Sequence, residues 1–296
     1  MVAAYLDCTH IVCKHNLCVI NLCICILCTS MYSPLSCRTD DNITNARGHQ
    51  MHDRYGLSGK TAVVTGATAG IGGAVAHGLS AAGAHVVAVG RDRQRGEALC
   101  DRISAEGGSV EFVSADVGEQ SGLDDVLDVA RARPVDILVN NAGTAILGPT
   151  EALTPTDFDK MIATNIRGAF FLVAGIAPGM AERGSGSIVN VSSMAGAVGT
   201  PGAAVYGATK SALESLTRSW AAEYSARGVR INSVAPGPTY TAAAPRDWFD
   251  TVGLTTAMQR AAEPTEIGEM ILFLSSERAS YVTGSTFPVD GGRTAI

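Results

Sequence analysis

From residue 60 onward, short apolar runs alternate with longer segments that have helical spacing. The runs are rich in β-branched residues, as buried strands are, and they span 60–65, 85–89, 110–114, 135–140, 187–193, 229–235 and 285–289. The helical segments between them span 69–82, 93–105, 123–132, 154–180, 203–226 and 265–275. Thr154 and Pro155 are suited to begin the fourth of these as its N-cap and first helical residue. Strands joined by helices of this length form parallel βαβ units. The pattern therefore predicts an α/β fold, with one doubly wound parallel sheet of about seven strands and helices on both faces.

The alternation continues to the end of the chain without a linker-like stretch, so we expect a single domain over residues 56–296. The first 55 residues differ in composition. Seven of the eight Cys lie before residue 38, and of the 33 Gly only Gly48 lies in the first 50 residues. We expect residues 1–55 to be an N-terminal extension outside the fold.

Two interpretations of this extension stay open. In one, the apolar stretch 16–28 behind Lys14 and His15 is the core of a targeting segment. It is shorter than the roughly 20 apolar residues that span a bilayer. In the other, which we favour, the stretch precedes the working protein, whose start is then Met31 or Met51.

The composition excludes several classes of function. A net charge of −6 without a basic run argues against nucleic acid as a partner. The clustered Cys have irregular spacing and no matching His pattern, so we expect neither a metal site nor a disulfide framework. We expect a cytoplasmic protein without a membrane partner, in which Cys100 is a reduced, packed thiol.

The segment from Thr65 to Gly72 joins the first strand to the first helix and also contains Gly66 and Gly70. Glycines permit a tight turn and let the backbone approach a pyrophosphate, which binds at the positive helix N-terminus. A Gly-rich loop alone is a weak signal. This one lies between a strand and a helix in the first βα unit, which is the context that dinucleotide binding requires.

Tyr206 and Lys210 are four residues apart in the segment 203–226, so they lie on the same face of the predicted helix. A nearby cation favours the phenolate over the phenol. We therefore expect the pKa of Tyr206 to lie below its free value of about 10, which would suit a proton-transfer group near neutral pH.

The spacing T-G-x-x-x-G-x-G at 65–72 resembles that of the short-chain dehydrogenase/reductase family, in its short, single-domain branch. Ala69 departs from the loop of the extended branch. The resemblance continues in order over residues 57–293, through Asp116-Val117, Asn140-Asn141-Ala142-Gly143, Asn165, Ser192-Ser193, Tyr206-x-x-x-Lys210 and Pro236-Gly237. It implies a Rossmann-like sheet and a nicotinamide cofactor.

The resemblance also implies a role for each residue of a catalytic tetrad. Ser193 lies 13 residues before Tyr206, the usual spacing, so we prefer it to Ser192 as the donor to the substrate oxygen. Tyr206 would be the general acid in ketone reduction and the base in alcohol oxidation. Lys210 would hold the nicotinamide ribose, and Asn165 would position a water that links Lys210 to solvent.

Cofactor contacts are implied along the whole crevice, with Thr239 and Thr241 expected at the nicotinamide carboxamide. The residues expected to make them are Gly66, Thr68, Gly70, Ile71, Gly72, Arg91, Asp116, Val117, Asn141, Ala142, Gly143, Tyr206, Lys210, Pro236, Gly237, Thr239 and Thr241.

The choice between NADP(H) and NAD(H) depends on the end of the second strand. Members that bind NAD usually have an acidic residue there for the ribose 2′-hydroxyl, but this chain has Gly90 followed by Arg91. Arg91 can pair with a 2′-phosphate, and Arg93 is a second candidate. Against this, Ala69 stands where many NADP members have a basic residue, and Asp92 is close by. We favour NADP(H), with NAD(H) as the alternative.

The segment 242–262 corresponds to the substrate lid of the family and contains Trp248 and Phe249. These aromatics either cover an apolar ligand or pack onto the body of the domain. The pocket should also include 144–147 and 194–196. None of these residues identifies the substrate.

These features together predict an oxidoreductase that interconverts a secondary alcohol and a ketone. A 3-oxoacyl thioester, a sugar, a steroid or a small carbonyl compound would fit the resemblance. The alternative is a dinucleotide-binding regulatory or scaffold protein with weak or no turnover, which the tetrad disfavours. A Rossmann-like methyltransferase is disfavoured for the same reason.

The resemblance further implies a homo-tetramer. The helices at 203–226 and 165–180 would pair across one interface, and residues 288–296 would lie at another. The sequence itself shows only that these helices are apolar enough for such contacts.

Overall fold

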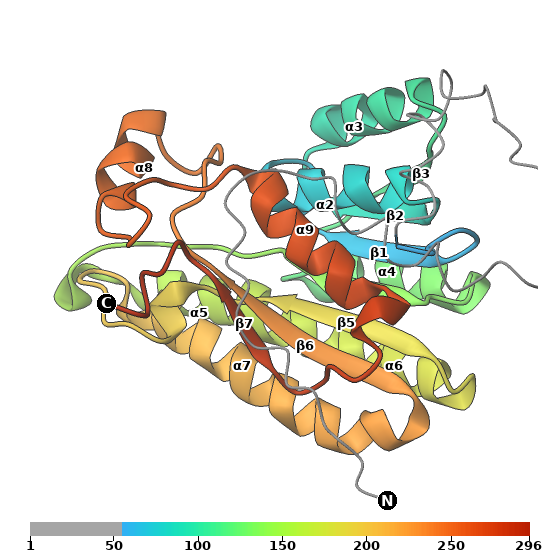
Figure 1. Cartoon of the computed structure of the whole chain (residues 1–296). Helices are drawn as coiled ribbons and strands as arrows, with labels where there is room; N and C mark the ends of the chain where they lie inside the picture. The colour runs from blue at the N-terminus through green and yellow to red at the C-terminus, as the bar shows by residue number, and fades with distance from the viewer. Residues whose placement is uncertain (1–54) are drawn as a thin grey trace, which may run out of the picture. The chain divides into compact units, whose positions relative to one another are not determined.

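The computed structural model describes residues 55–296 and has one parallel sheet at its centre (Figure 1). Its seven strands are β1 (Thr61–Thr65), β2 (His85–Gly90), β3 (Ser109–Ser114), β4 (Ile137–Asn140), β5 (Gly186–Val191), β6 (Val229–Pro236) and β7 (Thr286–Val289). Their order is β3-β2-β1-β4-β5-β6-β7, and every neighbouring pair is parallel. The predicted doubly wound α/β sheet is therefore confirmed. The prediction about the N-terminal extension falls on residues 1–54, outside the described part.

Helices cover both faces of the sheet (Figure 1). The longer ones are α2 (Gly70–Ala81), α3 (Arg93–Ala105), α4 (Gln120–Ala132), α5 (Pro155–Ile162), α6 (Ala169–Glu182), α7 (Ala204–Tyr224), α8 (Arg246–Gly253) and α9 (Pro264–Ser275). The shorter ones are η1 (Thr150–Ala152), η2 (Ala163–Gly168), η3 (Met194–Gly196), η4 (Ser225–Arg227) and η5 (Glu277–Ala279). Helices α2, α3 and α9 pack on one face, and α4, α6 and α7 pack on the other.

Helices on both faces of the sheet explain why the strands contain continuous apolar runs. Successive side chains of a strand point to opposite faces. In β1, Ala62 and Val64 join the core under α2 and α9, and Val63 between them joins the core under α6 and α7. Because both faces are buried, Ala62 to Val64 are apolar at successive positions and do not alternate with polar residues.

The helical region predicted at 154–180 is continuous, but its winding changes midway. Thr154 caps α5 with Asp157 in a reciprocal capping box, and Pro155 occupies the first turn, as predicted. A π-helical segment, η2, then separates α5 from α6. By length and composition the run Pro155–Glu182 could cross a membrane, but 44% of its most apolar window is buried in the fold, as is usual for a core helix.

Candidate active site

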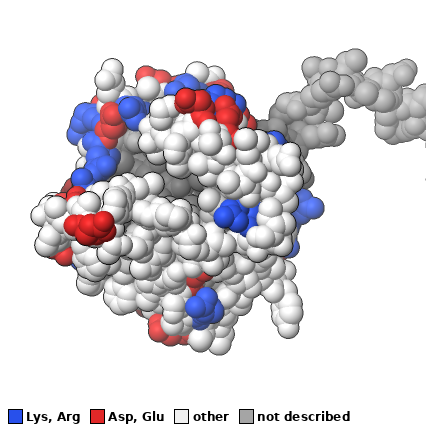
Figure 2. Space-filling view, turned by 90° about the vertical axis from the view of Figure 1, so that its left-hand side faces the viewer, with Lys and Arg blue, Asp and Glu red and all other residues white. Residues whose placement is uncertain are grey.

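The candidate site lies at the carboxyl ends of the strands, where the sheet order reverses between β1 and β4. Connections on either side of such a point leave in opposite directions and open a crevice. Figure 2 shows this face hollowed, with Lys and Arg side chains gathered at one side of the rim. A cleft of about 490 Å³ is lined there by Gly66, Thr68, Gly90, Arg91, Asp92, Arg95, Ala115, Asp116, Val117, Ala142, Gly143, Thr144 and Thr164.

The Gly-rich loop is shaped for close backbone approach. Gly66 and Gly70 have φ angles of 65° and 54°, which side chains disfavour. A Cβ on Gly72 would lie 2.2 Å from the carbonyl oxygen of Gly66 and 2.4 Å from Nδ2 of Asn141. The first turn of α2 therefore packs directly on the loop, and this cradle fits the pyrophosphate of a dinucleotide.

Asn141 braces this loop. Its Nδ2 donates to the carbonyl oxygens of Thr65 at 2.8 Å and Gly66 at 3.2 Å. The Thr65 hydroxyl in turn accepts from the backbone N–H groups of Asn141 and Ala142, both at 3.0 Å. The sequence predicted Asn141 as a cofactor contact, but the donors of its amide are engaged by the loop itself.

The predicted cofactor-binding residues converge on one crevice. Seven of them line the cleft described above: Gly66, Thr68, Arg91, Asp116, Val117, Ala142 and Gly143. The remaining ones lie in the first turn of α2, after β4, on α7 and after β6: Gly70, Ile71, Gly72, Asn141, Tyr206, Lys210, Pro236, Gly237, Thr239 and Thr241.

Two Arg residues line the cleft near the end of β2. Arg91 directly follows β2, and Arg95, which was not predicted, lies in the first turn of α3. Nη1 of Arg91 lies 3.3 Å from Oδ2 of Asp116. Arg95 lines the cleft as well, and its Nε lies 3.2 Å from Oδ2 of Asp92, the N-cap of α3. Arg93, the second candidate from the sequence, instead lies 3.9 Å from Glu97 and does not line the cleft.

Arg93 therefore lies away from the cleft lining, and helical spacing explains why. Asp92 caps α3, so its side chain accepts from the backbone N–H of Arg95, three residues on, at 3.0 Å. Arg95 thus lies on the same side of the helix as the N-cap residue Asp92, and both line the cleft. The start of the helix, read as a capping pattern, was the signal that could have identified Arg95.

Gly90 is held at the end of β2 by packing. A Cβ at this position would lie 2.5 Å from Cγ2 of Thr68 in the Gly-rich loop. The missing side chain therefore has two consequences: position 90 itself offers no carboxylate to a ribose 2′-hydroxyl, and Thr68 occupies the space that a side chain there would need.

Ser193 and Tyr206 meet at the inner end of this crevice. The Ser193 hydroxyl is close enough to the Tyr206 phenol to oppose the rise of its pKa, and it accepts from the backbone N–H of Ala195 at 3.2 Å. Ser192 points elsewhere: its hydroxyl donates to Oε1 of Glu214 at 2.5 Å. The geometry therefore supports the preference for Ser193 over Ser192.

The expected lowering of the Tyr206 pKa is contradicted. Burial of the phenol raises its pKa above the ordinary value, and the nearby Ser193 hydroxyl only partly opposes this. Nζ of Lys210 lies 5.7 Å from the centre of the Tyr206 ring. Desolvation of the phenolate outweighs the cation, a balance that helical spacing alone does not reveal.

Lys210 is a buried ammonium. Its Nζ donates to the carbonyl oxygen of Val191, at the end of β5, at 2.7 Å. Burial lowers the pKa of Lys210 to about 8, and the carboxylate of Glu214 acts against that lowering. A Cβ on Gly143 would lie only 3.4 Å from this Nζ, so the N-N-A-G segment after β4 contacts the same group.

Asn165 lies in the π-helical segment with its side chain fully buried. Its Oδ1 accepts from the backbone N–H of Thr144 at 2.7 Å. Its Nδ2 donates to the Thr144 carbonyl oxygen and to the Thr209 hydroxyl, both at 2.9 Å. Thr209 donates in turn to the Tyr206 carbonyl oxygen at 2.7 Å. Asn165 therefore ties the loop after β4 to the helix of Tyr206, and both of its N–H donors are used in doing so.

The segment after β6 returns to the Gly-rich loop. The Cγ2 atom of Thr241 would lie 2.9 Å from a Cβ on Gly70, so this side chain packs against the first turn of α2. Thr239 is buried, and its hydroxyl donates to the Gly237 carbonyl oxygen at 3.0 Å. Thr241 therefore lies beside the Gly-rich loop, and the contact of both Thr residues with a nicotinamide amide stays a prediction.

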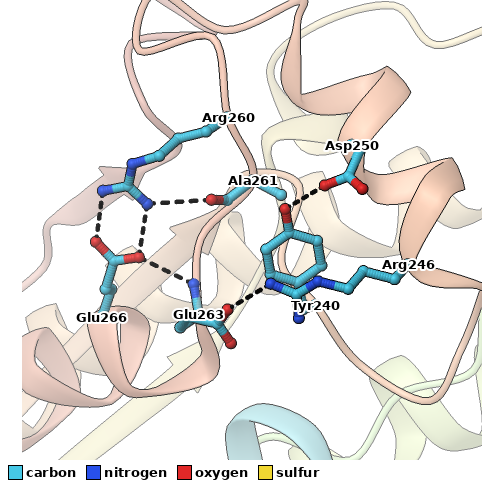
Figure 3. A network of polar contacts seen from close by, with 7 residues as sticks. All are labelled: Tyr240, Arg246, Asp250, Arg260, Ala261, Glu263 and Glu266. Carbon is cyan, nitrogen blue, oxygen red and sulfur yellow. Dashed lines mark hydrogen bonds and ion pairs between the residues drawn. The ribbon is translucent and has the colours of Figure 1, made fainter.

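Tyr240, between these two Thr residues, anchors the lid helix α8 through an exposed polar network (Figure 3). Its hydroxyl donates to Asp250. The guanidinium of Arg246 stacks 3.7 Å from the centre of its ring and donates to Glu263 at 2.9 Å. Glu263 begins α9, so α8 is attached to both of its neighbours.

The two lid aromatics behave differently. Phe249 is 7% exposed and packs edge-on against the Tyr240 ring at a centroid distance of 6.0 Å. Trp248 packs edge-on against Phe249 but remains 46% exposed. Of the two alternatives left open by the sequence, Phe249 follows the one in which the ring packs onto the protein.

Comparison with known proteins extends the likeness over nearly the whole described chain. The family model described as enoyl-(acyl carrier protein) reductase matches residues 66–294. Gluconate 5-dehydrogenase from Gluconobacter oxydans (strain 621H) is 36% identical over 249 residues, which cover 82% of this chain and 97% of the relative.

Solved structures agree. A short chain dehydrogenase/reductase family protein is 49% identical with a TM-score of 0.74, over 81% of this chain and 99% of that one. The 3-oxoacyl (acyl-carrier-protein) reductase of Agrobacterium tumefaciens C58, with NADP bound, is 34% identical with a TM-score of 0.76, over 85% of this chain and 99% of that one. The chain belongs to the short-chain dehydrogenase/reductase family, and it is an oxidoreductase that uses a nicotinamide dinucleotide.

Proposed function

We propose that the protein is an NADP(H)-dependent enzyme that interconverts a secondary alcohol and a ketone, with Tyr206 as the acid/base group. One observation supports this more than any other. The Tyr206 phenol lies close enough to the Ser193 hydroxyl to be acted on by it, and its ring centre is 5.7 Å from the Lys210 ammonium, which lies against Gly143 in the wall of the dinucleotide crevice. Maintaining the fold does not require this constellation.

Each residue then has a defined task. The Ser193 hydroxyl donates to the substrate carbonyl oxygen and stabilises the negative charge that develops there. Tyr206 gives its proton to that oxygen, and its raised pKa keeps the phenol protonated near neutral pH, which suits the reduction direction. Lys210 orients the ribose, while Asn165 holds the loop and helix around it. When bound, the nicotinamide supplies the hydride chemistry.

Turnover is tested by the change in absorbance at about 340 nm in a panel of ketones and alcohols, with wild type and Tyr206→Phe. The panel should contain 3-oxoacyl thioesters, sugars, steroids and small carbonyl compounds, because the relatives named above act on a sugar acid and a 3-oxoacyl group. We expect Tyr206→Phe to lose at least about 10²-fold in kcat. Cofactor binding without any turnover by the wild type would favour a regulatory or scaffold role instead.

The preference for NADP(H) is based on Arg91 and Arg95, which line the cleft beside Gly90. A 2′-phosphate would replace Asp116 and Asp92 as their partners. We expect Arg91→Ala and Arg95→Ala each to raise KM for NADPH by about tenfold or more, with little change for NADH. Arg93→Ala is the matched control, because Arg93 does not line the cleft. Equal effects of all three variants would contradict the assignment.

We further propose a homo-tetramer formed through α6 and α7, with residues 288–296 at a second interface. Phe170 and Phe171 of α6 are 41% and 45% exposed, and Phe170 continues onto Trp220 of α7. Such an apolar patch on a folded chain favours self-association. Sedimentation at micromolar concentration tests this, and a monomer would refute it.

A cytoplasmic location without membrane or nucleic-acid partners completes the proposal, supported by the net charge of −6. Cell fractionation tests it. Recovery with membranes would contradict it.

A further inference from the structure

A carboxylate lies directly behind the catalytic pair. Glu214 follows Lys210 by four residues on α7, so the two side chains occupy neighbouring positions on one helix face. Its side chain is half-buried, and its Oε1 accepts from the Ser192 hydroxyl at 2.5 Å. The same hydroxyl lies 3.3 Å from the carbonyl oxygen of Lys210. None of the tasks assigned above uses this carboxylate.

Glu214 forms one of two contacts that clamp the turn carrying Ser193. Before Ser193, Ser192 is bonded to Glu214 of α7. After it, the carbonyl oxygen of Gly196 accepts from the Ser211 hydroxyl of α7 at 2.6 Å. The turn therefore cannot shift along the helix without breaking a bond on one side. Because α7 also carries Tyr206, this clamp sets the distance between Ser193 and Tyr206.

The approach of turn and helix is close. A Cβ on Gly196 would lie 3.1 Å from the backbone N of Ser211 and 3.3 Å from Oε1 of Glu214. The carboxylate is thus enclosed between η3 and α7. A charge in this position is less screened by solvent than one on the outer face of the helix.

The same carboxylate is the charged group that acts on Lys210. The groups that contact or face the ammonium from other elements are neutral: the Val191 carbonyl of β5, Gly143 after β4 and the Asn165 amide of η2. On its own helix it faces the Tyr206 ring. Burial lowers the pKa of Lys210 to about 8, and Glu214 opposes this.

We propose that Glu214 is a positioning residue for the reaction: through Ser192 it fixes the turn that presents Ser193, and through space it stabilises the ammonium of Lys210. The positioning role rests on the function proposed above, whereas the effect on Lys210 does not depend on turnover.

The first experiment measures no activity. Midpoints of urea unfolding are compared from about pH 7 to about pH 9.5 for wild type, Glu214→Gln and the control Glu223→Gln, without cofactor. Glu223 is an exposed carboxylate on the same helix. Without Glu214, we expect the folded-state pKa of Lys210 to fall further below 10.5. The free energy of unfolding is then lower at pH 7 than in the wild type by the cost of that shift, and this difference disappears as pH rises. We expect a steeper rise for Glu214→Gln than for the other two proteins. Parallel curves would overturn the electrostatic role.

The second experiment uses the proposed reaction. In Glu214→Gln the alkaline limb of kcat/KM should move to lower pH by on the order of half a unit, while Glu223→Gln should follow the wild type. Ser192→Ala keeps the charge but removes the clamp, so we expect kcat to fall about tenfold or more with KM for NADPH unchanged. A wild-type kcat in Ser192→Ala would overturn the positioning role, including in the case that Glu214→Gln does not fold.

The two kinds of failure are distinguishable. If the wild type reduces no carbonyl compound at all, the proposed function fails, and the unfolding experiment still decides whether Glu214 acts on Lys210. If the wild type is active and Glu214→Gln matches Glu223→Gln in both experiments, only the role of Glu214 is refuted.

Discussion

Replacing Lys210 with Met should remove the cost of a buried charge and so raise the free energy of unfolding at neutral pH. This gain should shrink as pH rises, because the wild-type Lys210 then loses its charge. The pKa of Lys210 is about 8 in the folded protein against an ordinary value of 10.5. One pKa unit is worth about 1.4 kcal/mol, so the buried ammonium costs the fold on the order of 3 kcal/mol at pH 7. Met has a similar length and carries no charge.

Stability at one pH would not isolate this cost, because Met also leaves the Val191 carbonyl oxygen without its partner. An unsatisfied buried acceptor costs about 1–3 kcal/mol. That loss does not depend on pH, whereas the charge does. The pH dependence of the difference between the two proteins therefore measures the charge alone.

The sign follows from the folded pKa lying below the unfolded one. Between about pH 8 and 10.5 the unfolded chain binds a proton that the folded protein does not, so wild-type stability rises with pH. From about pH 7 to about pH 9.5 the wild type should gain about 2 kcal/mol relative to Lys210→Met.

Urea unfolding followed by circular dichroism, at one protein concentration and without cofactor, gives both curves. Other titrating groups are shared by the two proteins and cancel in the difference. Parallel curves would show that the ammonium is solvated in the folded protein. They would refute the conclusion that burial controls this group.

Three further outcomes are expected. Gly72→Ala places a Cβ 2.2 Å from the Gly66 carbonyl oxygen, so we expect loss of dinucleotide binding in a fluorescence titration; unchanged affinity would show that the loop can move aside. Gly90→Asp alone should weaken NADPH binding without gaining NADH binding, because its Cβ meets Thr68 at 2.5 Å, and an efficient switch to NADH would contradict this. Asn165→Ala removes three buried hydrogen bonds and should lower the free energy of unfolding by about 2–4 kcal/mol; wild-type stability would mean that Asn165 acts only on the reaction.

The sequence predicted the sheet well because each signal for it is local. Ala62, Val63 and Val64 of β1 are apolar at successive positions, a run that only a strand covered on both faces requires. Gly66, Gly70 and Gly72 follow directly, and their spacing describes the backbone of one turn. The capping residue Thr154 was predicted for the same reason, since an N-cap depends on its own next three residues.

The properties missed by the sequence depend on what surrounds a group in space. The pKa of Tyr206 rises because the folded chain buries the phenol, which the spacing to Lys210 does not report. Ser192 and Ser193 are adjacent and chemically identical. The family spacing distinguished them, but it did not explain why their hydroxyls point to different sides. In the structure both follow the end of β5 at Val191, and Ser192 is bonded to Glu214.

The network around Tyr240 also bears on the timing of turnover. Its ion pairs and hydrogen bonds are exposed, so water and salt compete with each of them. The buried contact of α8 is Phe249, which is 7% exposed. The chain neighbours of Tyr240 are Thr239 and Thr241, which lie at the expected nicotinamide end of the crevice. An opening of the lid therefore loosens the same backbone segment that faces the dinucleotide. Where release of the spent cofactor is the slow step, we therefore expect kcat to rise with ionic strength.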